Sequence, residues 1–374
     1  MIHTLAITNY RSLRRTVAPM GRLNVITGAN GSGKSNLYRA LRLLASTAQG
    51  GVIASLAREG GMESTLWAGP QSGQHSQEPV SLRLGFAADE LSYAIDLGFP
   101  VLSDSSFRLD PEIKRECIWA GPRYRLSALL ADRRGPLVRI RAMKGQWDVV
   151  RQGLAPFDSM LLQVADANRA PEVLSLREQI RSWRFYDFFR VDGAAPARQP
   201  QLGTRTPVLS ENGADVAAAL QTIREIGDSA GLDAAVEDAF PGSRVQIVSG
   251  NGRFEIEMQQ PGLLRPLKSA ELSDGTLRTL LWIAALLTPR PPQLMVLNEP
   301  ETSLHPDLLP ALARLIIRGA RDTQIWVVSH SSSLVAALAD SPDCRSLLLE
   351  KELGETRIAG QRLLEEPTWE WPER

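Results

Sequence analysis

The amino-acid sequence predicts an α/β fold built around a parallel sheet, and two observations lead to this prediction. Residues 23–27 have the pattern of an apolar strand that runs into a glycine-rich turn and then into an apolar-periodic helix at 35–45. From residue 273 onward, helices alternate with short apolar strands. Such alternation is typical of a parallel sheet with crossover helices.

The elements of this sheet can be placed along the chain. A first strand is predicted at residues 2–8, before the strand at 23–27. In the last third we expect helices at 273–287, 306–318 and 332–339, and strands at 293–297, 324–329, 345–350 and 355–359.

A β-rich insert is expected after the first helix. Residues 80–86 and 91–97 alternate apolar and polar side chains, as half-buried antiparallel strands do. Residues 47–78 are rich in Gly, Ser and Gln and are expected to form a loop with a short helix. Further strands are expected near 113–119, 137–142 and 146–151.

The region that follows the insert has mostly helical patterns, from about residue 159 to residue 240. A hairpin is then expected at 243–258, because Gly250, Asn251 and Gly252 favour a tight turn. The best helices are predicted at 171–184 and 215–226, and a proline-containing crossing loop at 192–207.

Composition is that of an ordinary globular protein. Of 374 residues, 43% are hydrophobic and 22% are charged, and 42 basic residues balance 42 acidic ones. A formal net charge of zero gives no overall attraction to nucleic acid or to an anionic membrane. Any polyanion must therefore be bound by a local patch.

Several classes of protein are disfavoured. The two distant cysteines, Cys117 and Cys344, and four scattered histidines indicate neither a disulfide framework nor a metal cluster. The longest strongly apolar run, Leu280 to Leu287, is too short to cross a bilayer. The first residues lack the pattern of a signal peptide. We therefore expect a cytoplasmic protein without a membrane partner.

The glycine-rich turn carries the strongest functional signal. Gly28 to Ser35 matches the phosphate-loop pattern G-x-x-x-x-G-K-[ST], in which backbone N–H groups surround phosphates. Lys34 would reach the β- and γ-phosphates, and the Ser35 hydroxyl would ligate Mg²⁺. The positive end of the following helix also favours anions. The strand before and the helix after argue against a glycine-rich turn without a ligand, so we predict ATP with Mg²⁺. The predicted nucleotide-binding residues of the loop are Asn30, Gly31, Ser32, Gly33, Lys34, Ser35 and Asn36.

An acidic strand end supplies a candidate catalytic base. The apolar run 294–297 ends in Asn298, Glu299, Pro300 and Glu301, and strand ends of this kind face ligands in open α/β sheets. Glu299 is the candidate that orients and polarises the attacking water. The alternative is a buried strand followed by an ordinary acidic turn.

Two further segments have weaker signals. Ser273 is a natural N-cap, and the free N–H groups of residues 273–276 form a potential anion site, although a plain capped helix is the simpler interpretation. The strand at 324–329 places His330 at the same sheet edge, where a lone histidine is more often structural. The phosphate loop, the Ser273 helix start, the acidic strand and the strand before His330 follow one another in this order. This order indicates a class of protein more specifically than any one of the four segments does.

This succession resembles the ABC-type ATPase heads, and within them the RecF/SMC/OLD-like group. The closer resemblance rests on Ile7 to Ser12, Gly28 to Asn36 and Asn298 to Pro306. The tail from Leu264 to Thr276 is similar to a RecF-like subgroup of predicted ATPases. The resemblance therefore implies an ABC-type P-loop head with a β-rich insert in the first lobe and a helical lobe. The lobes are expected at 1–155 (ATP-binding, with the insert), 156–265 (helical) and 266–374 (signature, Walker B and switch histidine).

The resemblance also implies a dimer. Such heads pair head to head on ATP binding, so Ser273 and Gly275 would contact the γ-phosphate held by the partner copy's phosphate loop. Glu299 would be the general base, and His330 would sense the γ-phosphate. Residues 301–303 would form the D-loop across the interface. Arg11 and Ser12 are expected near the nucleotide, and Gln163 is the candidate Q-loop ligand of the metal.

One position departs from the family pattern. The residue before the catalytic glutamate is usually an acid that holds Mg²⁺ through a water, and here it is Asn298. An amide oxygen can accept from a metal-bound water but brings no negative charge. We therefore expect weaker Mg²⁺ binding and slow ATP hydrolysis.

Two hypotheses about the function remain open. The first is an ATP-dependent dimer linked to DNA maintenance or repair, and the second is an ATPase switch of a phage-defence or toxin–antitoxin module that acts on a protein partner. The acidic strand differs from that of transporter subunits, so we do not expect one. Because few residues follow His330, we also do not expect the nuclease domain that OLD enzymes carry. Basic residues could contact DNA, but ion pairs on a solvated face are the favoured interpretation of Arg177, Arg181 and Arg184, and of Arg133, Arg134, Arg139, Arg141 and Lys144.

Overall fold

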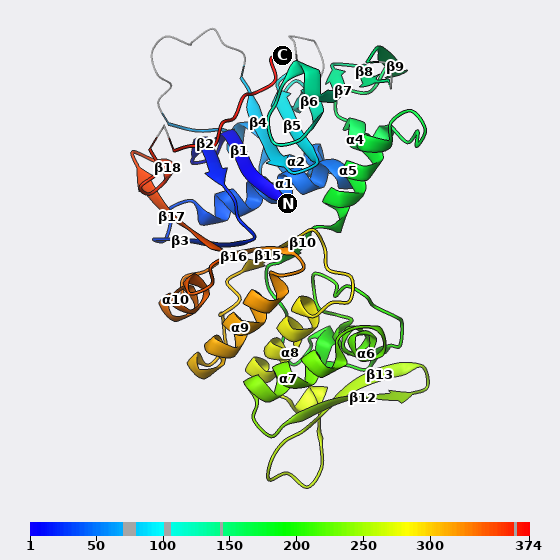
Figure 1. Cartoon of the computed structure of the whole chain (residues 1–374), viewed down its shortest axis with the longest axis vertical. Helices are drawn as coiled ribbons and strands as arrows, with labels where there is room; N and C mark the ends of the chain where they lie inside the picture. The colour runs from blue at the N-terminus through cyan, green and yellow to red at the C-terminus, as the bar shows by residue number, and fades with distance from the viewer. Residues whose placement is uncertain (70–79, 101–105, 143–144, 363–364) are drawn as a thin grey trace. The chain divides into compact units, whose positions relative to one another are not determined.

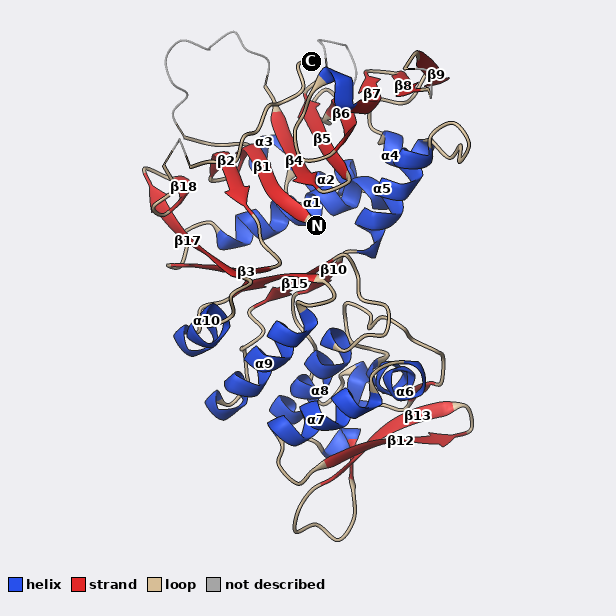
Figure 2. Cartoon of the chain, viewed as in Figure 1, coloured by secondary structure: helices blue, strands red, loops and turns tan. Residues whose placement is uncertain are grey.

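A computed structural model describes residues 1–69, 80–100, 106–142, 145–362 and 365–374 (Figures 1 and 2). Its contacts divide the chain into two compact units. The first unit contains Met1–Gly21, Thr27–Trp183 and Leu347–Arg374, and the second contains Arg22–Ile26 and Arg184–Ser346. Each unit is described by itself. The predicted lobe boundaries after residues 155 and 265 stay a prediction.

The first unit contains an antiparallel sheet of eight strands in the order β2-β1-β4-β5-β6-β7-β8-β9. It confirms the predicted β-rich insert and adds β2 and β7, which the sequence pattern did not indicate. The strands are β1 (Ile2–Tyr10), β2 (Leu13–Pro19), β4 (Leu82–Ala88), β5 (Leu91–Gly98), β6 (Glu112–Ala120), β7 (Leu129–Arg134), β8 (Leu137–Arg141) and β9 (Trp147–Arg151).

Helices cover one face of this sheet (Figure 2). The long helix α1 packs against β1 and β4 and buries an apolar stripe that includes Leu37, Leu41 and Leu44. The region 47–78 contains two further helices rather than the expected single one, and its residues 70–79 lie outside the described residues. The helices are α1 (Lys34–Gln49), α2 (Val52–Arg58), α3 (Gly61–Thr65), α4 (Met160–Gln163) and α5 (Pro171–Ser182).

Two C-terminal segments also belong to the first unit. The hairpin of β17 (Cys344–Glu352) and β18 (Glu355–Ile358) pairs Leu349 with Ile358, and most of it lies in this unit. Further on, the Trp369 ring packs edge-on against Trp119 of β6, with ring centroids 5.7 Å apart.

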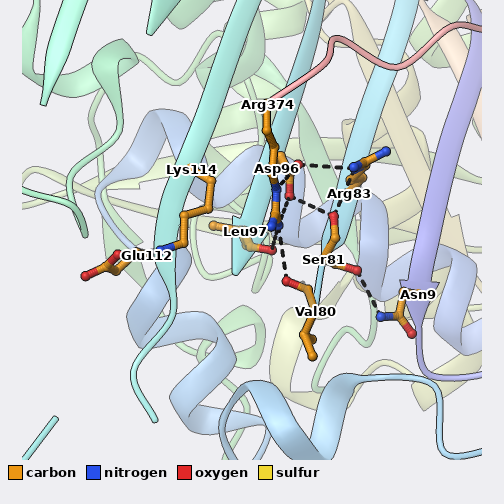
Figure 3. Close-up of polar contacts among 9 residues, drawn as sticks. All are labelled: Asn9, Val80, Ser81, Arg83, Asp96, Leu97, Glu112, Lys114 and Arg374. Atoms are coloured by element: carbon orange, nitrogen blue, oxygen red, sulfur yellow. Dashed lines mark hydrogen bonds and ion pairs between the residues drawn. The ribbon is translucent and has the colours of Figure 1, made fainter. Parts of the chain in front are cut away.

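The last residue, Arg374, is anchored on the eight-stranded sheet (Figure 3). The Arg374 guanidinium donates two hydrogen bonds of 2.8 Å to the carboxylate of Asp96 on β5. Ser81 and Arg83 donate to the same carboxylate, at 2.8 and 3.2 Å. Because Asp96 is buried, these donors supply the positive charge and hydrogen bonds that a buried carboxylate requires.

The second unit is built on the predicted parallel sheet. Its strands pair in parallel in the order β10-β15-β16-β3, with Val296 opposite Trp326 and Val327 opposite Val25. The central strands are mostly apolar and are buried except for the half-buried Asn298 at the end of β15, as is typical of parallel sheets. The strands are β3 (Leu23–Gly28, up to Ile26 in this unit), β10 (Arg184–Tyr186), β15 (Leu294–Asn298) and β16 (Gln324–Val328).

Helices and a small second sheet complete this unit. The helix α8 packs against α6, α7 and α9 and has buried side chains along almost its whole length. The predicted hairpin is confirmed as β12 (Arg244–Gly250) and β13 (Arg253–Gln259), to which β11 (Gln201–Leu202) and β14 (Leu267–Lys268) pair. The helices are α6 (Val216–Ile226), α7 (Ser229–Ala239), α8 (Asp274–Leu286), α9 (Leu309–Gly319) and α10 (Ser332–Ala339).

Within the described residues, no helix is long and apolar enough to span a bilayer.

Candidate functional site

The phosphate loop lies between the end of β3 and the start of α1, as predicted. Gly28, Gly31 and Gly33 have φ angles of 145°, 79° and 111°, which residues with a side chain rarely adopt. The Lys34 ammonium is nearly buried and donates to the carbonyl oxygens of Gly28 and Ala29, at 2.6 and 2.9 Å. The lysine therefore lies across the loop's own backbone, with its charge at the centre of the loop.

Close packing explains two of the glycines. An ideal Cβ on Gly28 would lie 2.3 Å from the Leu349 carbonyl oxygen, and one on Gly33 would lie 2.0 Å from the Thr356 hydroxyl oxygen. Both neighbours belong to the β17–β18 hairpin. The hairpin thus contacts both ends of the phosphate loop, a contact that no local sequence motif indicates.

The remaining residues predicted for this loop differ in exposure. Ser35, the predicted metal ligand, is exposed, as are Asn30 and Gly31. Ser32 is buried, and Asn36 donates from its amide nitrogen to the Ser12 hydroxyl at 2.7 Å. An exposed hydroxyl beside a cluster of backbone N–H groups and one lysine suits a phosphate with Mg²⁺.

Arg11 has an ionic partner inside the first unit. Its guanidinium lies 2.7 Å from a Glu59 carboxylate oxygen, to which the Tyr10 hydroxyl also donates at 2.7 Å. Burial, followed by the nearby Glu59, raises the pKa of Tyr10 well above its usual value, so this hydroxyl keeps its proton. Arg11 has a positive φ of 50°, and its predicted place near the nucleotide stays a prediction.

Gln163, the candidate Q-loop residue, is the last residue of α4 and is exposed. Its amide nitrogen donates to the Asp158 carboxylate at 3.2 Å. A metal-binding role for Gln163 therefore stays a prediction.

Glu299 and His330 lie together in the second unit. The imidazole Nε2 is 3.1 Å from a Glu299 carboxylate oxygen, and the two side chains are 39% and 45% exposed. Asn298 ends β15 opposite Val328 of β16, and the Glu299 N–H donates to the Val328 carbonyl at 2.8 Å. Parallel pairing thus brings the acidic strand end and the strand before His330 to one sheet edge, as predicted.

Glu299 has a strained backbone. Its φ of 49° is in the left-handed region, which is uncommon for a residue other than glycine and costs on the order of 1 kcal/mol or more. The Thr302 N–H donates to the Glu299 carbonyl at 3.0 Å and closes the turn that holds this conformation. Strained residues of this kind cluster at functional sites.

Glu301 holds the turn that carries His330. One of its carboxylate oxygens accepts from the Ser329 hydroxyl at 2.7 Å, from the His330 N–H at 2.8 Å and from the Ser331 N–H at 3.1 Å. The second oxygen is buried without a hydrogen-bond partner among the described residues. The resemblance implied a D-loop contact across the interface for residues 301–303, and this contact within one chain was not predicted.

The signature segment begins α8 as expected. Ser273 is the N-cap, and its hydroxyl oxygen accepts from the Thr276 N–H at 3.1 Å. Ser273 is exposed and Gly275 is half-buried, so the helix start is accessible. An ideal Cβ on Gly275 would lie 3.6 Å from the Ser303 carbonyl oxygen, so α8 and the loop after Glu299 are neighbours.

Two arginines and a tryptophan hold these segments together. Arg198 is nearly buried and donates to the carbonyls of residues 269, 270 and 272 and to the Asp274 carboxylate. Arg278 donates to the Thr302 carbonyl at 2.6 Å, and the Trp282 indole donates to the Pro300 carbonyl at 3.1 Å. Burial lowers the pKa of Arg278. No local sequence motif predicts the role of any of these three residues.

The basic residues mostly have acidic partners. Arg133 is fully buried against Glu116 at 2.8 Å, so it is not available to a DNA phosphate. Arg134 and Arg139 pair with Asp132. Arg177 and Arg181 pair with Glu178, as the favoured interpretation expected, and Lys144 lies outside the described residues.

The fold and the phosphate loop define a P-loop nucleotide-binding protein of the ABC-type head class. The chain belongs to the family described as "AAA domain, putative AbiEii toxin, Type IV TA system", whose sequence profile matches residues 23–116 and 158–336. The profile thus covers the phosphate loop, the signature segment, the acidic strand and His330. A search of curated proteins finds no match.

Solved structures with a similar fold include heads of SMC proteins. The chain is similar to an SmcHead bound to the C-winged helix domain of ScpA, with a TM-score of 0.50 and 15% identity over 97% of this chain and 99% of that chain. A second, the SMC head domain from Thermotoga maritima, gives a TM-score of 0.47 and 15% identity, with the same coverage. At this identity the first likeness shows a shared fold alone.

Proposed function

We propose that this protein binds ATP with Mg²⁺, hydrolyses it slowly and works as an ATP-dependent head-to-head dimer. The observation that carries the proposal is that one chain holds a formed phosphate loop and, on another segment, a Glu299–His330 pair at 3.1 Å. The exposed helix start at Ser273 supports the dimer, because an accessible N-terminus with free N–H groups suits a phosphate presented by another copy.

Each residue has a role in this proposal. Lys34 and the loop N–H groups would bind the phosphates. Ser35 would ligate Mg²⁺, which would neutralise phosphate charge, and Asn298 could accept a hydrogen bond from a metal-bound water. Glu299 accepts a proton from the attacking water, and the exposed carboxylate is free to reach it. His330, held by Glu301 through its backbone, donates toward the γ-phosphate. Ser273 and Gly275 act on the ATP of the partner copy.

The proposal is tested with Glu299→Gln, which keeps the shape of the side chain and removes the base. We expect this variant to bind ATP as the wild type does and to lose hydrolysis by roughly 100-fold or more. In gel filtration with light scattering, it should form a dimer with ATP and Mg²⁺ and stay a monomer without them. Lys34→Ala is the control that should neither bind ATP nor dimerise. A monomer under all conditions would contradict the dimer.

For the biological process, the resemblance to RecF-like heads motivates a role in DNA maintenance. The buried or paired state of Arg133, Arg134 and Arg139 offers no strong basic patch in support. If the protein has this role, duplex DNA should raise the ATPase rate, and the binding of DNA should weaken steeply as the salt concentration rises. A rate that DNA leaves unchanged, without salt-sensitive binding, would exclude this role.

A specific observation favours the second candidate. The family description names a putative AbiEii toxin of a type IV toxin–antitoxin system, so a place in a toxin–antitoxin module fits the family name. We propose that the protein would serve there as an ATPase switch that acts on a protein partner. Induced expression of the wild type should then slow growth, and Lys34→Ala should relieve the effect. Equal growth of the two strains would contradict a toxin that depends on ATP.

A further inference from the structure

A buried chain of hydrogen bonds joins the phosphate loop to the C-terminal hairpin. The Asn36 amide nitrogen lies 2.7 Å from the Ser12 hydroxyl oxygen, which lies 2.6 Å from the Thr356 hydroxyl oxygen. The Thr356 hydroxyl then lies 2.7 Å from the Ser32 carbonyl oxygen. All four residues belong to the first unit, and Thr356 is 1% exposed.

The direction of this chain follows from the chemistry of its two ends. An amide nitrogen can only donate, and a carbonyl oxygen can only accept. Ser12 must therefore donate to Thr356, and Thr356 must donate to Ser32. Each hydroxyl then donates once and accepts once within the chain, and successive bonds of this kind polarise one another in a low-dielectric interior.

The last bond fixes one peptide unit of the phosphate loop. The peptide between Ser32 and Gly33 is planar and trans, so its C=O and N–H point in opposite directions. Because the Ser32 carbonyl is held by Thr356, the Gly33 N–H is directed away from the hairpin. In a phosphate loop, backbone N–H groups directed inward are the phosphate ligands.

The hairpin also fits closely against the loop. Gly33 has a φ of 111°, and the space that its Cβ would occupy is taken by the Thr356 side chain. The Thr356 N–H donates to the Ser12 carbonyl at 2.8 Å, which anchors β18 beside the turn between β1 and β2. Thr356 therefore touches the phosphate loop through its hydroxyl and is held in place through its backbone.

We propose that Thr356 is a positioning residue for nucleotide binding, which acts with Ser12 to hold the Ser32–Gly33 peptide in its phosphate-binding orientation. This inference rests on the ATP binding proposed above. A loop ordered before the ligand arrives loses less conformational entropy on binding. Removing the hydroxyl should therefore weaken ATP binding itself.

The experiment compares Thr356→Val with Thr356→Ser in the full-length protein. Valine keeps the volume but leaves the Ser12 hydroxyl and the Ser32 carbonyl without their partner, whereas serine keeps the hydroxyl. We expect the Kd for ATP, measured by calorimetry, to rise roughly tenfold for Thr356→Val and to stay within about twofold for Thr356→Ser.

Thr222→Val is the matched control in the second unit. The Thr222 hydroxyl is also buried, donates to the Ala218 carbonyl at 2.7 Å and accepts from the Thr206 N–H at 2.9 Å. This variant should lower Tm by a similar amount and leave the Kd for ATP unchanged. A Thr356→Val protein that loses stability but keeps the wild-type Kd would overturn the inference.

Two further results keep the test decisive. If Thr356→Val fails to fold, Ser12→Ala breaks the same chain at its middle and should raise the Kd for ATP several-fold; an unchanged Kd would overturn the inference. A wild-type protein that binds no ATP would overturn the proposed function and this inference with it. A wild type that binds ATP, with variants that bind equally well, would overturn this inference alone.

Discussion

At the scale of single residues, Glu301 shows how a carboxylate can act on another side chain through the backbone. One of its oxygens accepts three hydrogen bonds from residues 329–331 and so fixes the backbone position of His330. The His330 imidazole in turn lies 3.1 Å from Glu299. The position of the proposed catalytic pair therefore depends on a residue that binds the backbone of His330.

This dependence predicts a selective defect for Glu301→Gln. Glutamine keeps the shape but replaces a charged acceptor with a neutral one, and hydrogen bonds to charged groups are worth about 1.5–3 kcal/mol. We expect the kcat of ATP hydrolysis to fall roughly tenfold or more, while the Kd for ATP stays within about twofold. Glu178→Gln, on an exposed helix face, is the control that should change neither. An unchanged kcat for Glu301→Gln would show that this turn does not depend on the charge.

Asn298 is the second residue whose chemistry can be tested directly. Asn298→Asp introduces the negative charge that the family resemblance implies before the proposed catalytic glutamate. We expect half-maximal activity at a lower Mg²⁺ concentration and a higher kcat, because a carboxylate attracts a hydrated cation more strongly than an amide does. Steady-state ATPase rates over a Mg²⁺ titration measure both quantities. If both stay at the wild-type values, the charge at this position does not limit turnover.

At the scale of elements, the sequence predicted what is encoded locally. The phosphate loop, the cap at Ser273 and the alternating strands and helices of the last third follow from short-range patterns, and the structure confirms these elements. The strand β7 was missed because it buries Asp132 and Arg133, and these charges break the apolar alternation. Thr356 was missed because its loop partner, Ser32, is 324 residues away along the chain.

The buried charges of β7 predict a large stability effect. Arg133 and Glu116 are both 0% exposed and 2.8 Å apart, and Arg133 also donates to the carbonyls of Gly135 and Ala155. Arg133→Met should lower the free energy of unfolding by about 3–5 kcal/mol, because it leaves the buried carboxylate of Glu116 without its cationic partner. Urea unfolding measures this change.

The control for this prediction is the neighbouring arginine. Arg134 is 49% exposed and pairs with Asp132 at 3.2 Å, so Arg134→Met should change the free energy of unfolding by no more than about 1 kcal/mol. Equal effects of the two substitutions would contradict the assignment of Arg133 to the core.

At the scale of the whole molecule, contacts inside the second unit join the parts proposed to act on ATP. Arg278 and Trp282 of α8 bind the carbonyls of Thr302 and Pro300, and the same loop contains Glu299 and Glu301. The signature helix, the acidic loop and the turn at His330 are therefore parts of one hydrogen-bonded assembly. In the proposed dimer, the signature helix of this assembly would complete the nucleotide site of the partner copy.

A composite site of this kind predicts complementation between two inactive variants. Lys34→Ala disables the phosphate loop, and Ser273→Arg blocks the exposed helix start, so each protein alone should lack ATPase activity. In a mixed dimer, the intact phosphate loop of the Ser273→Arg copy meets the intact signature segment of the Lys34→Ala copy. An equimolar mixture should recover up to about half of the wild-type rate per chain, because neither variant is expected to pair productively with itself and each mixed dimer has one intact site of two. A second mixture, of Lys34→Ala with Glu299→Gln, shows which copy's ATP Glu299 acts on. If Glu299 acts on the ATP bound by its own copy, no mixed dimer has an intact site and activity stays absent. If Glu299 acts on the partner's ATP, activity is partly recovered. No recovery in the first mixture would show that a single copy forms its own complete site.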